Sequence, residues 1–193
     1  MRKLFYILIV LVVIATAGYF GHKYYSDHKQ NQTLTTQSQG SNSSTKKAPE
    51  QTLPKTYPVG VYFSKRPDSD NDPSKVFAVS RTSPNLVVGK FAITELLKGP
   101  TGSESAQGYF TTAQLRSGES NCNGNDFILT IENSTATLKF CRVFNHLGVV
   151  ADGQADSELK ATLKQFSTVK KVIILNKDGN CEFDLSGMNL CKQ

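Results

Sequence analysis

Tryptophan is absent from the 193-residue sequence, and no stretch alternates aromatic residues with arginine. Proteins that bind single-stranded nucleic acid stack the bases on aromatic side chains inside a basic groove. The net charge of +6 does not provide such a groove, because residues 1–56 hold seven Lys and Arg against two Asp and Glu. Residues 57–193 hold 15 basic and 14 acidic side chains, a balance of +1. We therefore expect no nucleic-acid partner.

Motifs that carry catalysis or hold a cofactor are also missing. The sequence contains no G-x-S-x-G turn for a serine nucleophile and no Gly-Lys-Ser/Thr run for a phosphate. None of the four cysteines forms C-x-x-C, and His146 is the one histidine after residue 56, so the spacing of zinc ligands is lacking. We expect His146 to be an ordinary surface or packing residue. The sequence predicts no enzymatic activity, no catalytic residue, no cofactor and no metal.

One acidic segment has part of the spacing of a calcium loop. Asp68, Asp70 and Asp72 follow a D-x-D-x-D pattern. The sixth position of such a loop requires Gly and the twelfth requires Glu, but Pro73 and Val79 stand there. We interpret the segment as a solvated acidic turn between two strands.

The N-terminus carries a long apolar run, Leu4–Phe20, directly after Arg2 and Lys3. About 20 apolar residues in a helix cross a bilayer, and positive charges before the run place the N-terminus in the cytoplasm. We expect an uncleaved signal anchor over residues 1–25, which puts the rest of the chain outside the cell membrane. Secretion after signal cleavage is the alternative, because the segment 15–17 (Ala-Thr-Ala) has the small-x-small form of a cleavage site.

Residues 26–56 are rich in Ser, Thr, Gln and Asn and nearly lack apolar side chains. Such a segment cannot bury enough surface to offset the entropy lost on ordering. We expect a disordered polar linker here, followed by a folded domain over residues 57–193.

The four cysteines all lie late in the chain. An even number of cysteines in an exported domain indicates disulfides, and four cysteines allow three pairings. We expect Cys122 to pair with Cys141 and Cys181 with Cys191, because each bond closes a short loop. Cross-linking a loop of this size stabilises a fold by about 3 kcal/mol.

The pattern of apolar residues after residue 56 predicts an α+β fold. Alternation indicates strands, and a stripe at helical spacing indicates helices. Asn133-Ser134 is typical of a two-residue hairpin turn that places Glu132 opposite Thr135. We expect one mixed β-sheet with two helices packed on one face. The predicted strands are 59–63, 75–81, 126–132, 135–141 and 169–176, and the predicted helices are 85–98 and 154–167.

Several segments resemble the GerMN domain family, named after a spore germination and sporulation protein. The most specific are Glu95–Thr101 (ELLKGPT) and Leu163–Val172, with Gln165-Phe166 and a following VKKV. Weaker matches are Val61–Phe63, Val79–Thr82 and Thr135–Phe140, so the resemblance covers roughly residues 59–177. It implies a membrane-linked, extracytoplasmic module without catalytic residues, whose fold is similar to the ring-building motifs of secretion machinery.

These observations lead to two hypotheses about function. The first is a tethered GerMN-like domain that mediates protein–protein assembly at the bacterial cell envelope, with another envelope protein or with its own copies. Val59, Val61 and Phe63 are the expected interface if their strand lies at a sheet edge. The alternative is an exported domain that binds a small ligand or the cell wall, or a weak hydrolase, using the loop 107–122.

Overall fold

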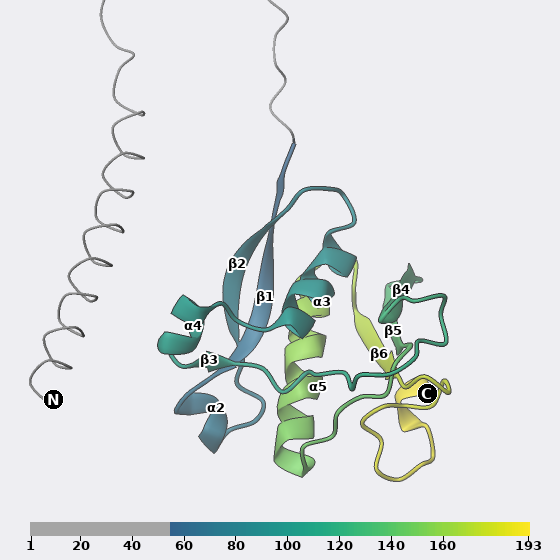
Figure 1. Ribbon diagram of the computed structural model, residues 1–193. Helices are drawn as coiled ribbons and strands as arrows, with labels where there is room; N and C mark the ends of the chain where they lie inside the picture. The colour runs from purple at the N-terminus through teal and green to yellow at the C-terminus, as the bar shows by residue number, and fades with distance from the viewer. Residues whose placement is uncertain (1–54) are drawn as a thin grey trace, which may run out of the picture. The chain divides into compact units, whose positions relative to one another are not determined.

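The computed structural model describes residues 55–193 (Figure 1). The expected signal anchor over residues 1–25 and all but the last two residues of the expected linker lie outside the described residues. Within residues 55–193, no helix has both the length and the apolar character needed to cross a membrane.

The described chain is α+β, as expected, but its strands form two sheets and not one. The first sheet has the order β2-β1-β3 and is antiparallel throughout. The second has the order β4-β5-β6, with β4 antiparallel and β6 parallel to β5. The elements in chain order are β1 (Tyr57–Lys65), α2 (Asp68–Asn71), β2 (Phe77–Ser83), α3 (Val88–Lys98), α4 (Gly102–Ala106), β3 (Tyr109–Phe110), β4 (Phe127–Glu132), β5 (Thr135–Phe140), α5 (Val149–Lys164), β6 (Lys171–Leu175) and a final 3₁₀ turn (Leu190–Lys192).

Side chains of α5 keep the two sheets apart, and Figure 1 shows α5 running between them. Three backbone N–H groups on one edge of β1 donate to side chains of this helix or of the residue that ends it. The pairs are Gly60 to Gln165 Oε1 (2.8 Å), Tyr62 to Thr162 Oγ1 (3.1 Å) and Ser64 to Glu158 Oε1 (3.1 Å). Every second residue of a strand offers its N–H to one edge, and helix positions i, i+4 and i+7 share one face. The helix thus occupies the edge where a joining strand would pair.

The core lies between α3, α5 and the inner faces of both sheets. Val59, Val61 and Phe63 of β1 belong to it, with relative exposures of 6%, 0% and 0%. The expectation that these three side chains form an interface is therefore wrong. Their alternation does mark one face of a strand, but both long helices contact that strand, and the face is interior.

The β4–β5 hairpin has the expected register. Asn133 and Ser134 both take positive φ values, 48° and 60°, as the two central residues of a type I′ turn require. Glu132 pairs with Thr135 and Phe127 with Phe140. The apolar residues of β5, Ala136, Leu138 and Phe140, are fully buried.

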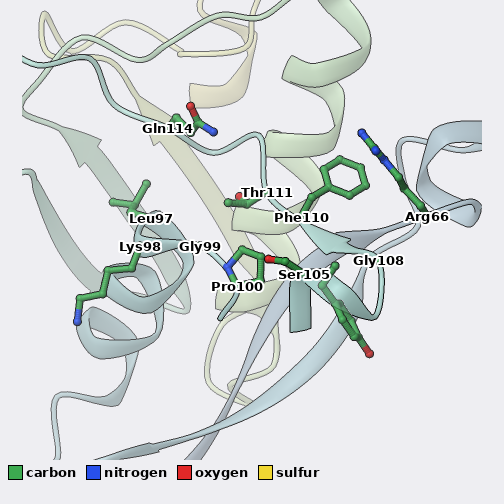
Figure 2. Close-up of a pocket in the computed structure, with 11 residues that line it drawn as sticks. Arg66, Leu97, Lys98, Gly99, Pro100, Ser105, Gly108, Phe110, Thr111 and Gln114 are labelled. Carbon is green, nitrogen blue, oxygen red and sulfur yellow. The ribbon is translucent and has the colours of Figure 1, made fainter. Parts of the chain in front are cut away.

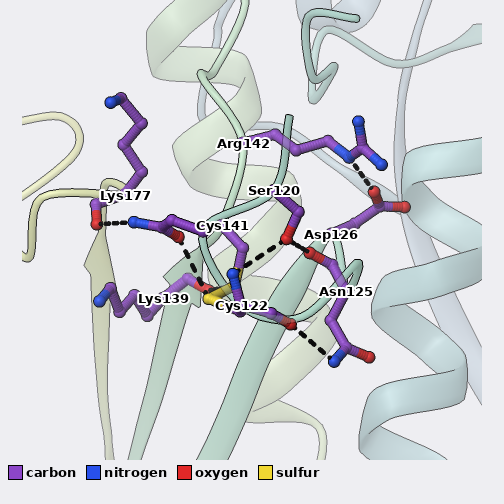
Figure 3. The surroundings of a disulfide bond; sticks show 9 residues. Ser120, Cys122, Asn125, Asp126, Lys139, Cys141, Arg142 and Lys177 are labelled. Atoms are coloured by element: carbon purple, nitrogen blue, oxygen red, sulfur yellow. Dashed lines mark hydrogen bonds and ion pairs between the residues drawn. A yellow bond between two sulfur atoms is a disulfide. The ribbon is translucent and has the colours of Figure 1, made fainter. Parts of the chain in front are cut away.

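The structure joins Cys122 to Cys141 and Cys181 to Cys191, with Cα separations of 5.5 and 6.0 Å. Figure 3 shows the first bond beside a hydrogen-bonded loop. The Ser120 hydroxyl donates to the Asn125 carbonyl (2.5 Å), and the Cys122 N–H donates to the Ser120 hydroxyl (3.1 Å). This bond fastens the long connection before β4 to the end of β5, and the second closes the C-terminal segment on itself.

Candidate functional site

An apolar groove of about 320 Å³ opens beside β4. Its lining comes from residues 86–90 at the start of α3, from Leu129 and Ile131 of β4, and from Phe166 and Thr168 after α5. Leu86, Val87 and Ile131 are 74%, 60% and 45% exposed. Large apolar side chains gathered on one surface mark an interaction site more often than single exposed ones do.

Gly89 allows α3 to approach β4 closely at this groove. A Cβ added at Gly89 would lie 3.2 Å from Leu129 Cδ2 and 3.7 Å from the Phe166 ring. The first of these distances is tighter than nearly all real contacts of a Cβ atom, so a larger residue would displace Leu129. The close packing holds the Leu129 side chain in the floor of the groove.

The outer edge of β4 carries backbone groups without a partner among residues 55–193. In a hairpin with a two-residue turn, the residues flanking the turn form a hydrogen-bonded pair, and such pairs recur at every second residue. Glu132 with Thr135 is that pair, and the Cys141 N–H donates to the Asp126 carbonyl (2.8 Å) at the other end. Phe127, Leu129 and Ile131 therefore direct their N–H and C=O groups away from β5. These are the same residues whose side chains face the groove side.

The remaining sheet edges of the described chain differ from this one. One edge of β1 is covered by α5 and β3. The edge of β6 is partly covered, because the Glu182 N–H donates to the Ile174 carbonyl (3.0 Å) and Leu175 pairs with Cys181. The outer edge of β2 is open but bears Ser80, Arg81 and Thr82. The edge of β4, in contrast, bears exposed isoleucine and has no lysine, proline or bulge to block strand addition; its one charged residue, Glu132, stands at its end beside the turn.

A second hollow, of about 560 Å³, is polar and lies between the end of α3 and β3 (Figure 2). The loop 107–122 contributes Gly108–Thr111 and Gln114 to its wall. Its two cations already have partners. Arg66 lies 3.7 Å from Asp70 and 5.2 Å from the Phe110 ring centre, and Lys98 lies 2.7 Å from Glu95.

A buried carboxylate lies behind this polar hollow. Glu158 is fully buried, accepts from the Ser64 N–H, and accepts from the Thr111 hydroxyl at 2.6 Å. Burial raises the pKa of Glu158, and these hydrogen bonds only partly oppose the effect. Glu158 joins α5 to β1 and to the loop at Thr111. Its hydrogen bonds therefore hold the fold together.

His146 lies between two carboxylates from different segments. Its Nδ1 is 3.0 Å from Asp152 Oδ2 and its Nε2 is 3.1 Å from Glu182 Oε1. Burial raises the pKa of Glu182, with a smaller opposite effect from His146. Because the two carboxylates occupy opposite ring nitrogens, the imidazole has no free nitrogen left for a substrate or a metal ion.

The acidic segment Asp68–Asp72 is engaged locally. It forms the short helix α2 and the turn after it, and so departs from the plain turn expected. Asp68 lies 3.9 Å from Lys75, and Asp72 accepts from the N–H and the hydroxyl of Ser74 at 3.0 and 2.6 Å. Across residues 55–193 no three His, Cys, Asp or Glu side chains are grouped so that they could hold a metal ion.

Arg81 forms a partly buried ion-pair cluster with two glutamates. Glu95 Oε2 lies 3.7 Å from Arg81 Nε. The main partner is Glu104, which accepts from both terminal guanidinium nitrogens at 2.6 and 2.7 Å. This bidentate pair lowers the pKa of Glu104 to about 2.

The helix α4, which carries Glu104, was not predicted from the sequence. A capping box starts this helix: the Thr101 hydroxyl accepts from the Glu104 N–H, and the Glu104 carboxylate accepts from the Thr101 N–H. The T-x-x-E spacing at residues 101–104 is the signal that would have found it.

Similarity to known proteins is found among solved structures. No protein-family model matches the sequence, and no curated protein matches it. Among solved structures, the chain is similar to the tandem GerMN domains of the sporulation protein GerM from Bacillus subtilis, with a TM-score of 0.39 and 20% sequence identity. The similarity covers 68% of this chain and 43% of that one. The chain thus spans less than half the length of the structure that it matches.

Proposed function

We propose that residues 57–193 are a non-catalytic, GerMN-like assembly domain that docks a protein segment on the outer edge of β4. The observation that carries this proposal is the coincidence of two features on one strand. Phe127, Leu129 and Ile131 present backbone groups that have no partner within the described chain, and the same strand forms one wall of an apolar groove.

Strand addition explains why both features occur together. An extended segment that pairs with β4 satisfies the outward N–H and C=O groups, and its alternate side chains enter the groove. The backbone bonds supply affinity for any extended chain. The groove supplies selectivity for apolar residues spaced two apart, because Leu86, Val87 and Phe166 leave room for such side chains.

The proposed location is outside the cytoplasmic membrane of a bacterial cell. Disulfides persist in oxidising compartments, and the described chain contains two with no free cysteine. The apolar run Leu4–Phe20, preceded by Arg2 and Lys3, serves as the membrane anchor in this proposal. The polar segment 26–56 then acts as the tether between the anchor and the domain.

Membership of the GerMN family is part of the proposal and rests on sequence segments. The segment Glu95–Thr101 ends α3, where Gly99 has a φ of 85° that favours glycine, and Pro100 cannot continue the helix. The segment Gln165–Val172 connects α5 to β6, and its Gln165 caps the edge of β1. The resemblance thus falls on residues with defined structural tasks.

Site-specific photo-cross-linking in cells that express the full chain tests this function. A photo-reactive residue replaces Val87 in the groove, and the matched control replaces Lys177, whose side chain is 43% exposed in the turn after β6. We expect cross-linked protein adducts at position 87 that are absent at position 177. Equal labelling at both positions, or none at position 87, contradicts docking at this groove.

A further inference from the structure

We infer that the segment docked on β4 is the β4 strand of a second copy of this chain, paired antiparallel about a two-fold axis at Leu129. The inference rests on the proposed function and names its partner. The two copies together form a continuous six-stranded sheet, β6-β5-β4 followed by the partner's β4-β5-β6.

The pattern of outward backbone groups selects this register. A two-fold axis perpendicular to the sheet requires that paired residues lie on the same face, so their numbers differ by an even amount. Hydrogen-bonded pairs must also join two outward residues. Placing Leu129 opposite the partner's Leu129 pairs Phe127 with the partner's Ile131 and Ile131 with the partner's Phe127. In this register every outward N–H and C=O group of β4 forms a hydrogen bond with the partner strand. Sliding one strand by two residues leaves some of these groups without a partner.

The side chains on the groove face suit the same register. Leu129 lies opposite the partner's Leu129 at the axis, and the half-exposed Ile131 lies opposite the partner's Phe127, whose ring is packed in the core and only 5% exposed. Apolar pairs across antiparallel strands are favourable. The two apolar grooves then lie on the same side of the joined sheet and continue into each other.

The charges permit close approach of two copies. Residues 57–193 carry a balance of only +1, so two domains repel each other weakly. On the outer face the register brings Glu132 near the partner's Asp126. That contact is acceptable because Arg142 Nε lies 2.5 Å from Asp126 Oδ1, and its guanidinium can also serve Glu132 of the partner subunit.

A pairing of two short strands with adjoining grooves is smaller than the interfaces of about 1,200–2,000 Å² that hold most stable dimers. Dimers of this kind need a high local concentration. Two copies held in one membrane by the proposed anchor meet this condition, because anchoring raises the effective concentration of one domain around another. We therefore expect pairing on the membrane and weak association in dilute detergent solution.

Cysteine cross-linking of the full chain in membrane vesicles tests the pairing and its register. Leu129→Cys places two thiols across the axis with Cα atoms about 5.5 Å apart, within the range of a disulfide. Thr130→Cys is the matched control, because Thr130 faces the partner's Ile128 and its own counterpart lies two residues along the strand. We expect mild oxidant to give about ten-fold more covalent dimer with Leu129→Cys than with Thr130→Cys. Adding Ile131→Lys to Leu129→Cys should abolish the dimer.

Three outcomes separate this inference from the proposed function. Equal or absent cross-linking of both cysteine variants, with the native disulfides intact by peptide mapping, overturns the second-copy inference. If position 87 then still cross-links to another protein, the docking function stands without self-pairing. If neither position 87 nor position 129 cross-links to any protein, both proposals fail.

Discussion

Glu158 illustrates how a single buried side chain organises this fold. Its carboxylate accepts from the Ser64 N–H and the Thr111 hydroxyl, so it joins β1, α5 and the loop before β4. Its raised pKa shows that burial disfavours the ionised form. We therefore expect the hydrogen bonds of this side chain to contribute more to stability than its charge does.

Replacing Glu158 by two different residues separates shape from charge. Glu158→Ala leaves the Ser64 N–H and the Thr111 hydroxyl buried without a partner, and we expect a loss of about 3 kcal/mol in the free energy of unfolding. Glu158→Gln keeps both contacts, since its amide can accept from Ser64 and donate to the Thr111 hydroxyl, and should cost less than about 1 kcal/mol. Urea unfolding of the full chain, followed by tyrosine fluorescence, measures both variants. Equal losses would show that the charge itself is required.

The pair of Arg81 and Glu104 predicts that the free energy of unfolding falls at acidic pH. The pKa of Glu104 falls from an ordinary 4.5 to about 2, so the folded state binds this proton less tightly than the unfolded chain. Stability from Glu104 is therefore complete above pH 4.5 and is lost as the pH falls from 4.5 toward 2. Glu104→Gln should lower the free energy of unfolding at pH 7 by about 2 kcal/mol. The variant should then lose less of its remaining stability than the wild type as the pH falls from 4.5 toward 2. Glu119→Gln, at an exposed residue, is the control, and an acid profile unchanged by Glu104→Gln contradicts the assignment.

At the scale of single elements, the β4–β5 hairpin shows what local sequence determines. Both turn residues and both alternating strands lie within residues 126–141, so the pattern predicted the register that the structure has. The split into two sheets depends on contacts that no local pattern reveals. Gly60 and Gln165, which form one of those contacts, lie 105 residues apart.

The groove beside β4 was not predicted, for a related reason. Leu86 and Val87 fall within the predicted helix 85–98. The structure starts α3 at Val88, and the Asn85 side chain accepts from the Val87 N–H (3.0 Å) in the turn before it. The two apolar residues therefore lie on an exposed turn, and only the placement of β4 beside that turn makes a groove.

The hairpin turn itself can be improved, because Ser134 has a side chain at a φ of 60°. Left-handed backbone is unfavourable for most residues with a Cβ and free of strain for glycine. We expect Ser134→Gly to raise the free energy of unfolding by about 0.5 kcal/mol, after the entropic cost of glycine is subtracted. Thr135→Gly, one residue later in the strand, should instead lower it. A loss of stability from Ser134→Gly, measured by thermal unfolding, contradicts the turn type.

For the whole molecule, the two disulfides fasten the parts that the core does not hold. They close loops with sequence separations of 19 and 10 residues. We expect each double serine variant, Cys122→Ser with Cys141→Ser or Cys181→Ser with Cys191→Ser, to lose about 3 kcal/mol in the free energy of unfolding.

The number of free thiols in the denatured full chain should rise by four when reductant is added, because the described chain has no free cysteine. An equal number of thiols with and without reductant contradicts both bonds.

Strand addition to β4 is the central claim, and amide hydrogen exchange measured residue by residue tests it most directly. In the isolated chain the outward amides of Leu129 and Ile131 should exchange much faster than the amide of Thr130, which faces β5. When the full chain is concentrated on membrane vesicles, we expect Leu129 and Ile131 to become protected while Thr130 changes little. Unchanged, rapid exchange at Leu129 and Ile131 under assembly conditions would show that the edge of β4 stays open and that the domain does not dock there.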